Sequence, residues 1–325
     1  MDIVCCPDKN YVMPTGVMMC SLCENNRNED ITFHIIHADL DENDKESLAN
    51  IAKQYGKEIY FYTVKINRLP DIILGAEGQQ KLPLAAYFRL CLTEFLPTHI
   101  NKVLYLDGDI IIRSSLKELW ETNIDGFALA GVPDDNLFNG HIEQTYNQLK
   151  YSPVLGYFNS GVLLINLVYW RKKNVTSEFV MVINNKKDGF IHHDQDILNL
   201  VFAERKKFIP LKYNLMPGFL LNPQYRKISW EYNVEIEEAA RNPIVVHYTG
   251  IKPWYKECHH PYKKEFFRYK ALTKWKDEPL MRMHSIPLNW IKSTVKRILI
   301  NLHLINNRPM PSWAYTSNDL VSNKQ

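Results

Sequence analysis

One stretch of the sequence decides the fold: Leu104-Tyr105-Leu106-Asp107-Gly108-Asp109-Ile110-Ile111. Its apolar first part predicts a buried strand, and two carboxylates follow that strand. In extended backbone the side chains of Asp107 and Asp109 point the same way, so both can face one ligand. Mg²⁺ or Mn²⁺ takes oxygen ligands of this kind, and a diphosphate can complete the coordination shell. A polar turn after a strand is the alternative, and this stretch alone leaves both open.

The rest of the first half alternates between strand and helix patterns. Strands are predicted at 2–6, 31–37, 58–64 and 102–106, and helices at 11–24, 41–54 and 84–95. This alternation predicts a parallel α/β sheet over roughly the first 130 residues. Ligands of such sheets bind at the carboxyl ends of the strands, where Asp8 and Asp107 are expected. The second half is less regular, with strands predicted at 127–132, 161–166 and 244–248 and helices at 167–185 and 194–204.

Three further polar segments can carry chemistry. His247 ends an apolar strand and is followed by Gly250 and Lys252, whose amide and ammonium suit a phosphate. A satisfied buried histidine is the alternative for His247. Asp194 and Gln195 open a helix, where they either cap it or present polar groups to a sugar. Asn159, in Phe158-Asn159-Ser160-Gly161, serves either turn chemistry or a hydroxyl-rich ligand.

The charge is divided unevenly along the chain. Residues 1–250 carry 25 Lys and Arg against 31 Asp and Glu, whereas residues 251–313 carry 13 against 4. The acidic body argues against a nucleic-acid partner, and the basic end argues for an anionic one. The start of the chain has no basic, apolar leader, and no window is apolar enough to span a membrane, so we expect a cytoplasmic protein.

Residues 285–305 predict a basic amphipathic helix. Apolar residues recur there at steps of three and four, flanked by Lys292, Lys296 and Arg297. This pattern is typical of a helix lying on an anionic membrane surface, so we expect peripheral attachment to the inner face of the cytoplasmic membrane. Packing on the catalytic domain or on a second subunit is the alternative.

These motifs, in this order, resemble family 8 retaining glycosyltransferases, and most closely the bacterial lipopolysaccharide galactosyl- and glucosyltransferases. The resemblance runs from Met1 to about residue 260. It is carried by Asp2-Ile3-Val4 with Asp8, Asn10 and Tyr11, by Tyr87-Phe88-Arg89-Leu90, by Lys102–Asp109, by Phe158–Asn166, by Asp194–Asn199, and by His247-Tyr248-x-Gly250 with Lys252-Pro253-Trp254.

The resemblance implies a mixed, nucleotide-binding sheet of the GT-A type flanked by helices, as a catalytic domain over 1–260. A basic helical region that associates with membranes is then expected over 261–325. The implied activity is transfer of a hexose from UDP-galactose or UDP-glucose to a glycan acceptor, with retention and with Mn²⁺ or Mg²⁺. The acceptor expected is lipopolysaccharide or lipooligosaccharide core, or another lipid-linked oligosaccharide.

The resemblance also implies roles for single residues. Asp107, Asp109 and His247 would hold the metal, with Gly108 between the carboxylates. Asp8 and Asn10 would bind uracil or ribose, and Gly250 and Lys252 the diphosphate. The donor hexose would be oriented by Arg89, Asn159, Asp194 and Gln195. Asp194 and Gln195 would lie at the reaction centre with the two metal-binding aspartates.

Two alternative functions remain open. A self-glucosylating primer protein would belong to the same family, but no acceptor tyrosine stands out among 18. A metal-dependent phosphatase or sugar-nucleotide hydrolase can also carry Asp-x-Asp after a strand. In the phosphatases that motif follows the first strand, whereas here it follows the fourth.

Overall fold

The computed structural model describes residues 1–65, 84–139, 141–186, 189–221 and 230–283, with single positions at 295, 298 and 299. The helix predicted at 285–305 therefore lies, apart from those three positions, outside the described residues. No helix among the described residues is both long enough and apolar enough to cross a bilayer.

The centre of the fold is a seven-stranded sheet with the order β3-β2-β1-β4-β7-β6-β8. Its first half is parallel and confirms the four strands predicted there: β1 (Asp2–Cys5), β2 (Thr32–His37), β3 (Glu58–Thr63) and β4 (Lys102–Leu106). The long strand β7 (Phe158–Asn166) then runs antiparallel to β4 and to β6 (Leu129–Pro133), which pairs in parallel with β8 (Lys206–Phe208). The sheet is therefore mixed, as the predicted fold class requires.

A second, two-stranded sheet begins shortly after β4 in the sequence. Strand β5 (Ile110–Ile112) pairs antiparallel with β9 (Val245–His247), and Ile110 lies opposite His247. The sequence pattern predicted β9 but did not separate β5 from the loop after β4. This pairing brings Asp109, which directly precedes β5, close to His247, which ends β9.

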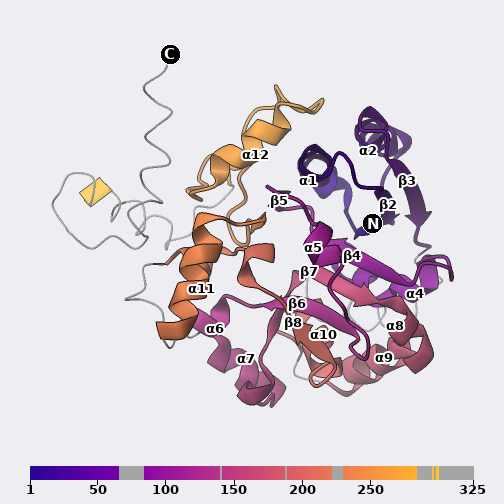
Figure 1. The fold of residues 1–325 in the computed structure, drawn as a ribbon, viewed down its shortest axis with the longest axis vertical. Helices are drawn as coiled ribbons and strands as arrows, with labels where there is room; N and C mark the ends of the chain where they lie inside the picture. The colour runs from indigo at the N-terminus through magenta and orange to yellow at the C-terminus, as the bar shows by residue number, and fades with distance from the viewer. Residues whose placement is uncertain are drawn as a thin grey trace.

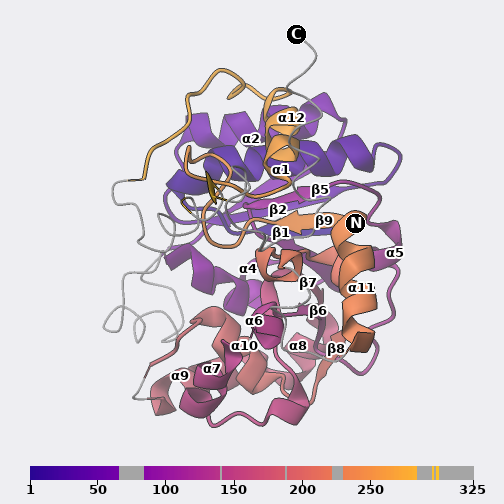
Figure 2. The same ribbon diagram turned by 90° about the vertical axis from the view of Figure 1, so that its left-hand side faces the viewer.

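Helices cover both faces of the large sheet (Figures 1 and 2). One face packs on α1 (Val12–Asn25) and α2 (Glu42–Gln54), and the other on η3 (Leu84–Cys91), α4 (Leu92–Phe95), α8 (Leu167–Lys173), α9 (Val175–Asn185) and α10 (Asp194–Val201). The shorter connecting elements and the helices toward the chain end are η1 (Lys9–Tyr11), α5 (Lys117–Trp120), α6 (Asn136–Asn139), α7 (Ile142–Leu149), η4 (Pro153–Leu155), η5 (Leu211–Tyr213), η6 (Pro217–Leu220), α11 (Trp230–Arg241) and α12 (Lys263–Lys270).

Two predicted helices differ from the structure. The helix predicted at 84–95 is mostly 3₁₀, in η3, with one α-helical turn after it. The helix predicted at 167–185 is divided at Asn174, whose φ of +49° ends α8 in the left-handed conformation. Asparagine adopts this conformation more readily than most residues, which explains why the chain can turn there.

Helix α12, at the start of the basic region, packs on helix α1, which covers one face of the large sheet. Asn25 of α1 donates a hydrogen bond to the Tyr269 hydroxyl of α12 over 2.8 Å, and Glu265 of α12 pairs with Arg113 over 3.6 Å. Trp275 lies so close to Gly16 of α1 that a Cβ added there would stand 2.3 Å from its ring. A domain boundary near residue 260, with a separate membrane-associating region after it, stays a prediction.

Candidate functional site

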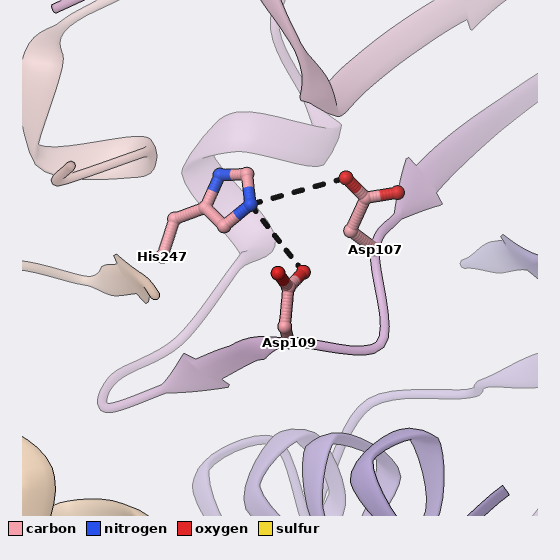
Figure 3. Close-up of side chains that lie close together, drawn as sticks. All are labelled: Asp107, Asp109 and His247. Atoms are coloured by element: carbon pink, nitrogen blue, oxygen red, sulfur yellow. Dashed lines mark ion pairs between the residues drawn. The ribbon is translucent and has the colours of Figure 1, made fainter. Parts of the chain in front are cut away.

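Two carboxylates and one imidazole converge where β4 ends (Figure 3). Asp107 follows β4 directly, Asp109 precedes β5, and His247 ends β9. The His247 Nε2 atom lies 3.4 Å from an Asp109 carboxylate oxygen and 3.9 Å from an Asp107 oxygen. One ligand atom of each residue lies within 4.8 Å of the other two.

This donor set fits a hard divalent cation. Carboxylate oxygens and a neutral imidazole nitrogen are ligands that Mn²⁺ and Mg²⁺ accept, and three protein ligands would leave coordination positions for other oxygens. Burial alone would raise the pKa of Asp109, but the Lys252 ammonium, which hydrogen-bonds its Oδ2, holds that pKa well below its ordinary value. Asp109 is therefore ionised at neutral pH.

Glycines make room for this cluster. A Cβ on Gly161 of β7 would stand 2.3 Å from the His247 ring and 2.8 Å from an Asp107 oxygen. A Cβ on Gly108 would stand 2.5 Å from the Thr15 hydroxyl of α1. Real Cβ atoms do not approach so closely, so a larger residue at either position would force the neighbouring side chains to shift.

A pocket of about 210 Å³ opens beside the carboxylates. Of the residues predicted to bind the donor, it brings together Asp8, Arg89, Asp107, Gly108 and Asp109. The remaining wall is formed by Cys6, Pro7, Tyr11, Thr15, Ala85, Ala86 and Tyr105. Asn10 does not line this pocket.

The Asp8 side chain also has a structural role. It accepts hydrogen bonds from the backbone N–H groups of Asn10, over 2.8 Å, and Tyr11, over 3.1 Å, and so caps η1. This cap helps to place the N-terminal end of α1 next to the pocket, which Thr15 lines.

Arg89 connects two acidic groups of the site. Its Nη2 atom donates to Asp107 over 2.9 Å, and its Nε atom lies 3.2 Å from Asp194. The guanidinium stands 4.4 Å over the Tyr105 ring, and the Tyr105 hydroxyl donates to the same Asp107 oxygen over 2.9 Å. Burial raises the pKa of Asp194, and Arg89 opposes that rise.

Gln195 of α10 and Asn159 of β7 are held in place by hydrogen bonds. The Gln195 amide oxygen accepts from Ser160 N over 3.0 Å and from Asn159 Nδ2 over 3.1 Å. Both side-chain amides also donate to Asp134, over 3.0 and 3.1 Å. These side chains are buried, so their positions are set before any ligand binds.

Sequence reasoning missed Asp134 and Asn214. Asn214 is fully buried, and its Oδ1 lies 3.0 Å from His247 Nδ1. The only signal in the sequence is that Asn214 stands between Tyr213 and Leu215, which does not reveal a partner 33 positions away.

Gly250 and Lys252 lie in the loop after β9. Gly250 has a φ of +82°, which glycine adopts without strain, and an added Cβ there would meet no atom within 4 Å. Lys252 donates to the Tyr248 carbonyl over 2.9 Å as well as to Asp109. Its ammonium is therefore held at the edge of the metal-ligand candidates.

Comparison with known proteins gives the same assignment across the chain. A family model described as "Glycosyl transferase family 8" matches residues 2–258. General stress protein A of Bacillus subtilis is 27% identical over 85% of this chain and 94% of its own length. Lipopolysaccharide 1,3-galactosyltransferase of Salmonella typhimurium is 26% identical, over 82% of this chain and 77% of its own.

A solved structure has a similar fold. The galactosyltransferase LgtC, in complex with donor and acceptor sugar analogues, superposes with a TM-score of 0.72 at 26% identity, over 90% of this chain and 99% of that one. An active-site mutant of LgtC, in which glutamate replaces a glutamine, superposes with a TM-score of 0.71.

Proposed function

The chain belongs to glycosyl transferase family 8, and on that basis we propose that this hexosyltransferase moves galactose or glucose from a UDP-sugar to a glycan acceptor, with retention at the anomeric carbon. The observation that carries the proposal is the cluster of Asp107, Asp109 and His247 within 4.8 Å, next to a pocket that reaches Asp8 and Arg89. A metal and a nucleoside diphosphate can share such a site.

The metal would be Mn²⁺ or Mg²⁺, held by Asp107, Asp109 and His247. When bound, it supplies Lewis-acid stabilisation of the diphosphate as the glycosidic bond breaks. Lys252 adds a positive charge on the same side, and its contact with Asp109 supports a place near the diphosphate. Gly250 offers a backbone N–H to the same group.

The donor would lie across the carboxyl ends of β1 and β4. Asp8 and Asn10 are assigned to uracil or ribose, which the pocket position of Asp8 supports. Arg89, Asn159, Asp194 and Gln195 are assigned to the hexose. The salt bridge of Arg89 to both Asp107 and Asp194 supports this, because it joins the metal side to the sugar side.

Retention is assigned to same-face substitution through an oxocarbenium-like state. The Gln195 amide oxygen already accepts two hydrogen bonds, which makes it a poor nucleophile and suits it to positioning. The bond from the anomeric carbon to the diphosphate breaks while the acceptor oxygen forms its bond on the same face. The leaving phosphate oxygen takes the acceptor's proton. A trapped glycosyl adduct on Asp194 would contradict this mechanism.

The acceptor is assigned to a glycan of the lipopolysaccharide or lipooligosaccharide core, presented at the cytoplasmic membrane. The lipopolysaccharide transferases among the relatives support this class of acceptor. Location in the cytoplasm, attached to the inner face of that membrane, belongs to the same proposal.

A panel of UDP-sugars tests the activity. Purified full-length protein with Mn²⁺ should release UDP from UDP-galactose or UDP-glucose, faster when deacylated lipopolysaccharide core is added, and EDTA should stop it. Asp109→Asn should lower this turnover by about 100-fold or more with its melting temperature retained, because the variant loses a charged metal ligand. Near-normal turnover of that variant would refute the metal assignment. Glucose attached to the protein itself would favour the self-glucosylating alternative.

A further inference from the structure

A line of buried amide side chains connects the proposed sugar end of the site with the proposed metal end. It runs from Asp134 through Gln195, Asn159 and Asn214 to His247, each 7% exposed or less. Neighbouring members are joined by hydrogen bonds of 2.9 to 3.1 Å. We call this line the amide relay.

Two backbone N–H groups determine which atom is the oxygen in two of the side-chain amides of the amide relay. A backbone N–H only donates, so Ser160 N, 3.0 Å from Gln195 Oε1, identifies that atom as the oxygen. Gly161 N, 2.9 Å from Asn159 Oδ1, does the same for Asn159. The NH₂ groups of both side chains then turn to the Asp134 carboxylate, which accepts from both.

The orientation of the Asn159 amide also determines that of the Asn214 amide. Because Asn159 Oδ1 accepts, the Asn214 atom 2.9 Å from it is the NH₂ nitrogen. The Asn214 oxygen then faces His247 Nδ1 over 3.0 Å. A carbonyl oxygen only accepts, so the hydrogen lies on Nδ1 of His247.

In the neutral imidazole, a hydrogen on Nδ1 leaves the lone pair of Nε2 on the side of the two carboxylates. Nε2 lies 3.4 Å from Asp109 and 3.9 Å from Asp107, with the lone pair on the side where a metal would bind. Without the Asn214 oxygen, either ring nitrogen could carry the hydrogen, and the Nε2–H form cannot bind a metal through that atom.

We propose that Asn214 is a positioning residue that holds His247 in the Nδ1–H tautomer. The amide relay thereby ties the metal affinity of His247 to the orientation of Asn159 and Gln195. This inference rests on the proposed function, because that function supplies the metal. Partners of this kind typically account for 10–100-fold in metal affinity.

The tautomer can be read without any metal. In full-length, metal-free protein labelled with ¹⁵N-histidine, the two-bond ¹⁵N–¹H spectrum of His247, assigned by its loss in His247→Gln, should report hydrogen on Nδ1. Asn214→Leu should shift His247 toward the Nε2–H form. Asn26→Leu is the matched control, since Asn26 is also a buried asparagine with its oxygen bonded to a backbone N–H, here that of Leu116. It should leave the His247 spectrum unchanged.

Metal and nucleotide binding separate Asn214 positioning from a loss of packing. Mn²⁺ binding, followed by the electron paramagnetic resonance signal of the free ion, should weaken about 10–100-fold in Asn214→Leu and stay unchanged in Asn26→Leu. Asn214→Asp keeps an acceptor for His247 Nδ1–H, so Mn²⁺ affinity should be retained. It places an acceptor against Asn159 Oδ1, so affinity for the UDP-hexose should fall while affinity for UDP stays unchanged.

The possible outcomes distinguish a failure of the positioning role of Asn214 from a failure of the proposed function. Unchanged His247 tautomer and Mn²⁺ affinity in folded Asn214→Leu would overturn the positioning role. If Asn214→Leu does not fold, a weakening of Mn²⁺ binding by 10-fold or more in Asn214→Asp would overturn it instead. If wild-type protein does not bind Mn²⁺, the proposed metal site fails, whereas the tautomer comparison still tests the amide relay.

Discussion

His260 is a buried histidine whose protonation opposes folding. Its Nδ1 atom accepts a hydrogen bond from Tyr262 N over 3.1 Å, and its ring meets Tyr248 at 4.8 Å between centroids. Burial, with a smaller effect of His247, lowers its pKa to about 3. Below the ordinary pKa of about 6.5, the unfolded chain takes up a proton that the folded protein excludes. The contribution to stability is therefore complete above pH 6.5 and is lost as the pH falls toward 3.

Urea unfolding at two pH values measures this effect. Between pH 7 and pH 5 we expect His260 to account for a loss of about 2 kcal/mol in the free energy of unfolding. His260→Gln should show a correspondingly smaller loss over the same interval, with EDTA present throughout. An equal loss in both proteins would show that His260 does not carry this pH dependence.

At the scale of residues, the sequence predicted the groups that carry charge. Asp107 and Asp109 stand next to each other in one motif, and His247 ends a recognisable strand, so their types and places were informative. Asn214 and Asp134 were not found, because their importance lies in contacts between segments that are distant in the sequence. Neither the isolated Asn214 nor Asp134, which lies in the polar stretch Asp134-Asp135-Asn136, reveals such contacts in the sequence.

At the scale of elements, β7 must pass close to the metal-ligand candidates. Gly161→Ala would set a methyl group 2.3 Å from the His247 ring, so the ring must move away from Asp107 and Asp109. We expect Mn²⁺ affinity to fall by 10-fold or more, on the order of the loss from a disturbed ligand. Titration of the folded variant with Mn²⁺ measures it.

Gly131→Ala in β6 is the control for packing. The nearest neighbours of a Cβ there would be the apolar side chains of Leu163 and Phe158, at 3.1 and 3.2 Å. That variant should lose some stability and keep its Mn²⁺ affinity. The same Mn²⁺ affinity in both glycine variants would contradict the close-approach argument.

The elements predicted correctly are those with a strong local pattern. The apolar runs of β1, β2 and β4 are typical of buried parallel strands, and α2 shows a clear apolar face with an Asp41 capping box. Strand β5 was missed because three isoleucines gain strand structure only from pairing with β9. The break at Asn174 was missed because it falls at the end of the polar run Arg171–Asn174, which does not by itself show where a helix ends.

At the scale of the whole molecule, some of the excess basic residues after residue 250 stabilise the fold. The Lys263 ammonium donates to the Tyr255 and Cys258 carbonyls, and that of Lys270 to the Glu278 carbonyl. These hydrogen bonds lie within the segment from Tyr255 to Glu278, so the two cations stabilise its local fold. We therefore expect membrane binding to depend on the cations after Met283, such as Lys292 and Arg297.

A truncation should separate membrane binding from chemistry. Met281 pairs with Trp254 and Lys256 through backbone hydrogen bonds of 2.9 and 3.0 Å, so the chain should be cut after Met283 to keep them. The shortened protein should no longer sediment with vesicles containing phosphatidylglycerol, because its cationic amphipathic segment is gone.

The same truncated protein should still transfer hexose to deacylated core oligosaccharide. Full-length protein with uncharged phosphatidylcholine vesicles serves as the control for charge. Sedimentation of the truncated protein with anionic vesicles would contradict a membrane role for residues 284–325.

The pairing of β5 with β9 has a consequence for biosynthesis. Asp107 and Asp109 leave the ribosome long before His247, and the two strands can meet only after the intervening chain has closed its loop, which costs entropy. The metal-ligand cluster should thus be among the last features to mature. A nascent or prematurely terminated chain that lacks β9 also lacks His247 and should be inactive. Incomplete chains would therefore not consume the sugar nucleotide.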